Sequence, residues 1–390
     1  MIMAGYEFKG DIPFENVYFT SIIRDSQGRK MSKSLGNSPD PLDLIQKYGA
    51  DALRYGIMLI APKGQDILFT EERLDVARNF MNKVWNASRF VLMNKDFDLT
   101  ADMVNPEKWK NLELADRWIL HRLNITIERI TRLLENFSFD ETARALWDFI
   151  WNDFCDWYIE MIKMRLYDGT PEQKQTAMSV AIYVLRDIMK LLHPYAPFMS
   201  EEIWQQIKLT DEPDLIVASW PVVKNTFNAP EEAKETDFLK KVITAIRTVR
   251  SEMNVPPSQS IKLVGRAHSQ AQLDILQKMQ ETIAKLTRAA DIEFGLDVSK
   301  PEFSASSMVE KMELFVPLEG LIDLSKEVER LENEIKATEG YLKAVKGKLA
   351  NKNFVDRAPE AVVAKERDKQ DHYMESLKKL REHVETMKTL

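Results

Sequence analysis

The sequence predicts a mainly α-helical chain with a helix bundle, a small α+β module and two long C-terminal helices. Apolar residues recur at spacings of three and four through most of the 390 residues, which is typical of amphipathic helices. Runs of β-branched and aromatic residues, typical of strands, are confined to the first ~48 residues and to a stretch after residue 257. At about 100–200 residues per domain, the length predicts two to three domains.

Composition narrows the class of protein. The chain is 44% hydrophobic and 29% charged, which is typical of a globular protein. A single cysteine, Cys155, excludes a disulfide framework and a cysteine-rich zinc site, and the five histidines show no HxxxH spacing. We therefore expect no metal centre. With no apolar run of about 18–20 residues and no secretory signal, we expect a cytoplasmic protein without membrane contact.

The N-terminal elements are a strand, a loop and a short helix. The run from Val17 to Ile23 predicts a strand, and residues 25–38 form a charged loop that contains glycine. Asp40 then has the position of a helix N-cap and Pro41 that of the first helical residue. Gly49 is expected to end this helix.

The middle of the chain predicts a helix bundle. The apolar spacing indicates helices over 70–94, 114–137 and 140–167, and a fourth from the capping box Thr170–Gln173 to His193. Shorter helices are expected from Ser200 and over 230–253. After the proline pair 256–257, strands are expected over 260–267, 291–296 and 312–316, and a helix over 270–289.

The last 70 residues carry the strictest periodicity. Seam positions alternate spacings of four and three over 324–349 and again over 363–387, and 351–359 interrupt them. The pattern predicts an antiparallel coiled-coil hairpin with arms of roughly 45 Å. Two ordinary amphipathic helices on a core are the alternative, but their apolar face would be broader.

Charge is unevenly spread along this hairpin. Residues 321–342 hold three basic and six acidic residues, whereas residues 343–369 hold eight basic and four acidic ones. A solvated hairpin of mixed charge is one interpretation. Because the whole chain has a net charge of −7, a basic distal part favours an arm that contacts phosphates. The candidate residues are Lys343, Lys346, Lys348, Lys352, Arg357, Lys365 and Arg367.

The loop at residues 29–37 is the candidate site for chemistry. Its lysines, hydroxyls and glycine suit an oligophosphate, although it lacks the GxxxxGK[ST] pattern. On the pattern alone, a solvated basic loop is the simpler interpretation. Its central string, however, resembles the KMSKS signature of class I aminoacyl-tRNA synthetases: Lys30, Met31, Ser32, Lys33 and Ser34.

Other segments resemble the same family. Residues 40–54 are similar to the segment after this signature in the isoleucine, leucine and valine enzymes, and 193–204 resemble the HPxxPFxxEEIW stretch of their anticodon-binding bundle. Residues 78–89, the junction 246–257 and the C-terminal hairpin with its tip 353–359 point to the valyl-tRNA synthetases. A cysteine-rich zinc module, common in the isoleucine enzymes, is excluded by the single cysteine.

The resemblance implies a division and a set of ligands. It implies the end of a Rossmann-type catalytic domain with the KMSKS loop (1–48), a helical stem-contact region (49–112), an anticodon-binding bundle (113–257), a connector (258–318) and a tRNA-binding arm (319–390). Lys30 and Lys33 resemble the lysines that stabilise ATP phosphates. ATP with Mg²⁺ and valine are the implied substrates of the full-length enzyme, and tRNA(Val) is the implied partner of a monomer.

One family signature is missing. No HIGH or variant of it occurs in the 390 residues, and the family places the amino-acid pocket and editing domain between HIGH and KMSKS. We therefore expect a C-terminal portion that is inactive alone and binds no cofactor. Two alternatives stay open: a helical scaffold for protein association, and a small nucleotide-binding enzyme.

Individual residues have structural interpretations as well. Cys155 lies among aromatic residues and is expected to be a buried thiol without catalytic function. His193, at a helix end before Pro194, is expected to cap. Most tryptophans, Trp147 and Trp151 among them, are expected in the core.

Overall fold

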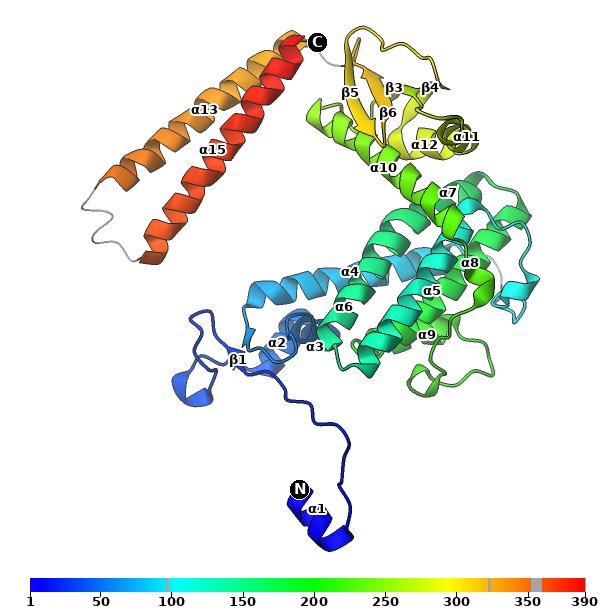
Figure 1. Cartoon of the computed structure of the whole chain (residues 1–390), viewed down its shortest axis with the longest axis vertical. Coiled ribbons are helices and arrows are strands. Elements are labelled where there is room, and N and C mark those ends of the chain that lie inside the picture. The colour runs from blue at the N-terminus through cyan, green and yellow to red at the C-terminus, as the bar shows by residue number, and fades with distance from the viewer. Residues whose placement is uncertain (96–97, 322–323, 352–359, 390) are drawn as a thin grey trace. The chain divides into compact units, whose positions relative to one another are not determined.

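The computed structural model describes residues 1–95, 98–321, 324–351 and 360–389 (Figure 1). The chain divides into two units, 1–236 and 237–390, and the boundary falls inside α10 (Pro230–Glu252). The first unit contains β1 (Ile23–Arg24) and β2 (Ile67–Leu68). Its helices are α1 (Ile2–Lys9), α2 (Pro41–Tyr48), α3 (Ala50–Leu59), α4 (Glu71–Met93), α5 (Leu114–Glu135), α6 (Phe139–Trp147), α7 (Ile159–Asp168), α8 (Pro171–Leu192) and α9 (Pro197–Ile207).

The N-terminal strand is shorter than the sequence predicted. Only Ile23 and Arg24 pair, in parallel with Ile67 and Leu68 of β2. A partner of two residues limits the ladder to that length. Upstream, Val17 and Phe19 are 57% and 81% exposed, whereas the Tyr18 ring packs against those of Phe137 and Phe139, with centroids 6.2 and 5.2 Å apart.

Helices α4, α5 and α8 follow the predicted pattern. The predicted apolar face of α4 is buried, and α8 begins with the predicted capping box, in which Thr170 and Gln173 bond each other's backbone amides. Aromatic rings join α3, α4 and α6 through the core. Tyr55 stacks on Phe80 and Phe80 on Trp147, with centroids 4.7 and 4.6 Å apart. Burial of Tyr55 and Phe80, and stacking of the half-buried Trp147 on Phe80, stabilise the bundle.

One predicted helix is in fact three segments. Between α6 and α7, residues Asp148–Tyr158 wind as a π-helix, and the Ile159 N–H bonds the Phe154 carbonyl five residues back. The wider winding accommodates a crowded set of buried side chains, which are Phe149, Ile150, Asp153, Phe154, Cys155 and Tyr158. Periodicity near 3.6 predicted the helical character of 140–167 but not this change of winding.

The second unit contains a four-stranded sheet of order β4-β3-β6-β5, in which β3 and β4 are parallel and the other pairs antiparallel. The predicted helix 270–289 breaks at Met279, and the serine-rich β5 was not predicted. The elements are β3 (Ile261–Arg266), α11 (Gln270–Lys278), α12 (Gln280–Thr287), β4 (Ala289–Gly295), β5 (Ser304–Val309) and β6 (Met312–Pro317).

Two long helices, α13 (Leu324–Ala350) and α15 (Glu360–Thr389), lie side by side and run in opposite directions (Figure 1). The described seam positions are buried or half-buried; the buried ones are Leu331, Val345, Val363, Glu366, Leu377 and Val384. The rings of Tyr341 and Tyr373 meet across the pair, with centroids 5.9 Å apart. Across the described segments, no helix has the length and apolar character needed to cross a membrane.

Candidate functional site

The lysine loop folds around one carboxylate, that of Asp25, which is 8% exposed. Its Oδ1 accepts hydrogen bonds from the backbone amides of Gln27 and Arg29, at 3.0 and 2.9 Å. Its Oδ2 accepts from Arg29 Nε at 2.8 Å and from Asn37 Nδ2 at 2.9 Å. These donors, Asn37 first and Arg29 next, stabilise the charged form and hold the pKa of Asp25 well below its usual range.

Asn37 closes the loop from its other end. While its Nδ2 donates to Asp25, its Oδ1 accepts from the backbone amide of Ser32 at 2.9 Å. The Ser32 hydroxyl in turn accepts from the Leu35 amide and starts a 3-10 turn, Lys33–Leu35. Gly36 ends that turn with φ 64°, a conformation that favours glycine. These bonds give the loop a defined shape.

The five residues of the signature string differ in exposure. Met31 and Ser32 are half-buried, whereas Lys30, Lys33 and Ser34 are exposed. Within the described residues neither lysine ammonium forms an ion pair, and the hydroxyls of Ser32 and Ser34 are 3.1 Å apart. The loop thus presents two unpaired positive charges and two hydroxyls, donors that suit a polyphosphate. Asp25 and Asn37, which shape it, were not predicted as site residues.

The segment after the loop is fastened to the helix bundle. The Asp51 carboxylate accepts hydrogen bonds from the amides of Phe198 and Met199 in the first turn of α9, at 3.3 and 2.6 Å. The Arg54 guanidinium donates to the carbonyls of Pro194 and Tyr195. The two segments that the sequence singled out, 40–54 and 193–204, therefore contact each other directly.

His193 stands at the end of α8, as predicted. Its Nδ1 lies 2.8 Å from the Ser200 hydroxyl, which itself donates to the Ala196 carbonyl at 2.7 Å. Burial lowers the pKa of His193, and the nearby carboxylates of Glu201 and Asp51 oppose this without reversing it. The ring therefore acts as a neutral donor that joins α8 to α9.

A buried ion pair crosses the bundle core. Both oxygens of the Asp116 carboxylate, fully buried, bond the Arg165 guanidinium at 2.7 Å, and Tyr158 donates to Oδ1 at 2.9 Å. Cys155 is 6% exposed, and burial raises the pKa of its thiol to about 12. Its predicted role as a buried thiol fits this position.

The predicted arm residues fall into three groups. Lys343, Lys346, Lys365 and Arg367 are exposed. Lys348 is exposed as well, with 59% of its side chain accessible, and its Nζ lies 3.7 Å from the buried Glu366, which also bonds Lys369 at 2.6 Å. Lys352 and Arg357 lie outside the described residues. No group of three or more His, Cys, Asp or Glu side chains in the described segments could hold a metal ion.

Family models match three parts of the chain in order. Residues 1–70 match the class I tRNA synthetases (I, L, M and V), residues 116–264 the anticodon-binding domain of tRNA ligase, and residues 323–388 the valyl tRNA synthetase tRNA binding arm. These matches agree with the signature loop, the bundle and the helix pair described above.

Curated relatives agree with the family models. Valine–tRNA ligase of Enterococcus faecalis is 42% identical over the whole chain, and that of Geobacillus kaustophilus is 41% identical. The chain spans 44% of the length of each relative. An Agrobacterium radiobacter LeuRS, solved with tRNA and LeuAMS, has a TM-score of 0.46, 22% identity and coverage of 67% of this chain and 33% of its own. By sequence, the chain belongs to the valyl-tRNA synthetase family and corresponds to the C-terminal region of its members.

Proposed function

We propose that the chain recognises and positions tRNA(Val) as the C-terminal part of a valine–tRNA ligase, the enzyme that joins valine to its tRNA using ATP. The observation that carries this proposal is the 42% identity to the Enterococcus faecalis ligase along the whole chain. An identity of that extent covers the loop, the bundle and the helix pair together. It therefore favours one tRNA-handling unit over an unrelated scaffold.

The signature loop is the proposed contribution to ATP chemistry. Lys30 and Lys33 would hold the ATP phosphates, which enter with Mg²⁺, and Ser32 and Ser34 would donate hydrogen bonds to them. Their role is electrostatic, because a charge that is already in place stabilises the negative charge that develops on the phosphates. The hydrogen bonds that Asn37 donates to the Asp25 carboxylate and the Lys30 carbonyl support this proposal, because they fix the backbone that carries both lysines.

The helix bundle is the proposed reader of the anticodon. Sequence-specific recognition of RNA usually takes place on single-stranded loops whose bases are splayed out and read at their edges. The contacts of Asp51 with α9 and of Arg54 with the turn before it support a role in which the bundle and the segment after the signature loop keep a fixed relation within the first unit. We retain the division at residues 48, 112, 257 and 318 as part of this proposal.

The helices α13 and α15 are the proposed arm, an antiparallel coiled-coil hairpin that contacts tRNA phosphates. The seam pattern supports the hairpin, and the exposed Lys343, Lys346, Lys365 and Arg367 support the contact. Lys352 and Arg357 remain part of the proposed contact by charge alone. We further propose that the chain is a cytoplasmic monomer.

Binding of tRNA to the whole chain tests this function. We expect it to bind tRNA(Val) more tightly than a tRNA with a different anticodon, with affinity that falls steeply as salt rises, because bound phosphates release counterions. Sedimentation at the same protein concentrations should give the mass of one chain. A chain that binds no tRNA but associates with itself would favour the scaffold.

A further inference from the structure

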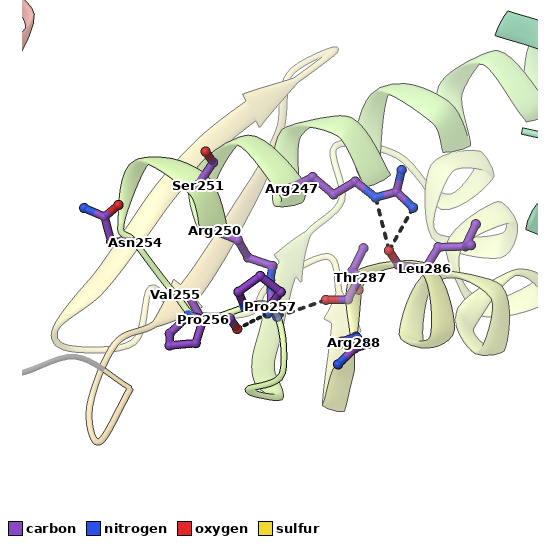
Figure 2. Close-up of a pocket in the computed structure, with 10 residues that line it drawn as sticks. All are labelled: Arg247, Arg250, Ser251, Asn254, Val255, Pro256, Pro257, Leu286, Thr287 and Arg288. Carbon is purple, nitrogen blue, oxygen red and sulfur yellow. Dashed lines mark hydrogen bonds between the residues drawn. The ribbon is translucent and has the colours of Figure 1, made fainter. Parts of the chain in front are cut away.

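A pocket of about 470 Å³ lies in the second unit, where the end of α10 meets the turn from α12 to β4 (Figure 2). Its lining includes three arginines and, among the ten residues that form it, no aspartate or glutamate. The chain as a whole has a net charge of −7, so this pocket gathers positive charge within an acidic protein. The pocket belongs to the junction 246–257 that the sequence singled out, and the proposed function leaves it without a role.

Backbone carbonyls hold two of the arginines in place. Arg250 is 8% exposed and donates to the carbonyls of Thr287, Pro256 and Gln259, at 3.1, 3.0 and 2.8 Å. Arg247 donates twice to the Leu286 carbonyl, both at 3.1 Å, as Figure 2 shows. A guanidinium carries five N–H donors, so Arg250 has two left after its three carbonyl bonds.

The third arginine, Arg288, is exposed and sits at the turn itself. It lies between the last residue of α12 and the first residue of β4, and its backbone is left-handed, with φ 54°. Burial, and then the like charge of Arg288, lower the pKa of Arg250, which means that the positive charges at this site repel each other. Within the described residues, neither Arg250 nor Arg288 is bonded to a carboxylate that would offset this repulsion. An anion in the pocket would offset it.

We propose that this pocket binds a phosphate group of an RNA backbone, with Arg250 as the fixed donor and Arg288 as the exposed one. Guanidinium groups suit phosphate because their planar fork matches two phosphate oxygens. The inference rests on the proposed function, since tRNA is the RNA in question. It adds a contact that lies in neither the bundle core nor the helix pair.

The test is tRNA(Val) binding by the whole chain at several salt concentrations, comparing the wild type with Arg288→Asn. Asparagine tolerates the left-handed backbone at this position, so the turn should keep its shape. We expect binding roughly tenfold weaker at low salt, the size of one lost charged hydrogen bond. The slope of log K against log salt should flatten by about 0.7–0.9, as for one lost phosphate contact.

Two further variants serve as controls. Lys300→Asn removes one exposed charge from the same unit outside the pocket and should leave affinity and slope much closer to the wild type. Arg288→Lys keeps the charge and should restore most of the binding. Equal melting temperatures for all variants establish that they fold alike. If the wild type binds tRNA and Arg288→Asn binds it equally well, the pocket assignment is wrong while the proposed function stands. If the wild type binds no tRNA, both are wrong.

Free phosphate is distinguished from RNA in a second arm. Inorganic phosphate and chloride are compared at equal ionic strength by their effect on the melting temperature of the wild type and of Arg288→Asn. If phosphate stabilises only the wild type and the variant binds tRNA normally, the pocket takes a small phosphate and the RNA assignment is wrong. If tRNA binding weakens as expected, the assignment stands whatever free phosphate does.

Discussion

The amide of Asn37 donates to the carboxylate of Asp25, with 2.9 Å between Nδ2 and Oδ2, and this bond ties the two ends of the lysine loop together. Because the same Asn37 side chain accepts from the Ser32 amide, a single residue couples the carboxylate to the signature backbone. The shape of the loop therefore depends on two side chains outside the signature string.

Asn37→Ala is expected to loosen this loop without unfolding the bundle. The Ser32 amide loses its acceptor, and Asp25 loses the strongest of the donors that hold its pKa down. Hydrogen exchange should become faster at the amides of residues 29–37 and stay unchanged in α5 and α8. Exchange in the loop as slow as in the wild type would show that the backbone bonds alone, such as that between the Met31 amide and the Ile23 carbonyl, fix its shape.

Arg165→Met should destabilise the bundle by about 3–5 kcal/mol, because it leaves the fully buried Asp116 carboxylate without its cation. Urea unfolding followed by the fluorescence of the bundle tryptophans measures this. Lys234→Ala is the control, since the Lys234–Glu231 pair is largely exposed on both sides and should contribute under about 1 kcal/mol. Similar losses for both variants would contradict the buried pair's importance.

Mild acid should weaken the junction between α8 and α9 through His193. Its pKa is lowered in the folded chain, so the folded state favours the neutral ring, and the stability this gives is present above the ordinary pKa near 6.5. That stability is lost as the pH falls below this value. We expect the difference in unfolding free energy between pH 7.5 and pH 5.5 to be smaller in His193→Gln than in the wild type. An equal difference in the two proteins would place the pH dependence elsewhere.

The thiol of Cys155 should resist modification in the folded chain. Burial raises its pKa to about 12, so the reactive thiolate is scarce at pH 8 and also shielded. Reaction with an aromatic disulfide reagent should therefore proceed only as the bundle unfolds, and faster in urea by orders of magnitude. Rapid reaction of the native chain would mean that the π-helical segment opens locally.

The exposed basic residues of the helix pair should contribute to tRNA binding as a group. Changing Lys346, Lys365 and Arg367 together to alanine should flatten the salt slope by about two to three units, at about 0.7–0.9 for each phosphate contact. Lys348→Ala needs separate treatment, because Lys348 lies 3.7 Å from the buried Glu366 and its loss should also lower the stability of the pair. A triple variant with unaltered affinity and slope would make these charges a solvated surface.

Periodicity predicted the helices well because each buries one face. The buried residues of α4 and the seam residues Leu331, Val345 and Leu377 lie at the predicted spacings. Caps that depend on local chemistry were also predictable, and Asp40 accepts from the Leu42 amide as expected. Predictions failed where residues distant in the sequence determine the structure. The strand predicted from Val17 to Ile23 is not formed over that length, because β2 offers it only two residues to pair with.

The site was predictable only in part, for the same reason. The signature string was visible in the sequence. The hydrogen bond that shapes the loop joins Asp25 to Asn37, twelve positions away, and no local pattern marks that bond. The arginine pocket depends on residues 247–257 meeting residues 286–288, which only the fold brings together. The contact of Lys348 with Glu366 was not predicted either, because it crosses from one helix to the other.

The π-helical segment Asp148–Tyr158 sets the angular phase between the two ends of one continuous helical rod. Tyr158 and Arg165 bond Asp116 only because the rotation of the helix about its axis turns both side chains toward that carboxylate. Removal of one residue from the segment would rotate everything downstream by roughly a quarter of a turn, the rotation of one helical residue. The guanidinium would then point away from its carboxylate, although every side chain of the pair were still present. For this helix, the number of residues between the two ends therefore constrains the core as strictly as their identity does.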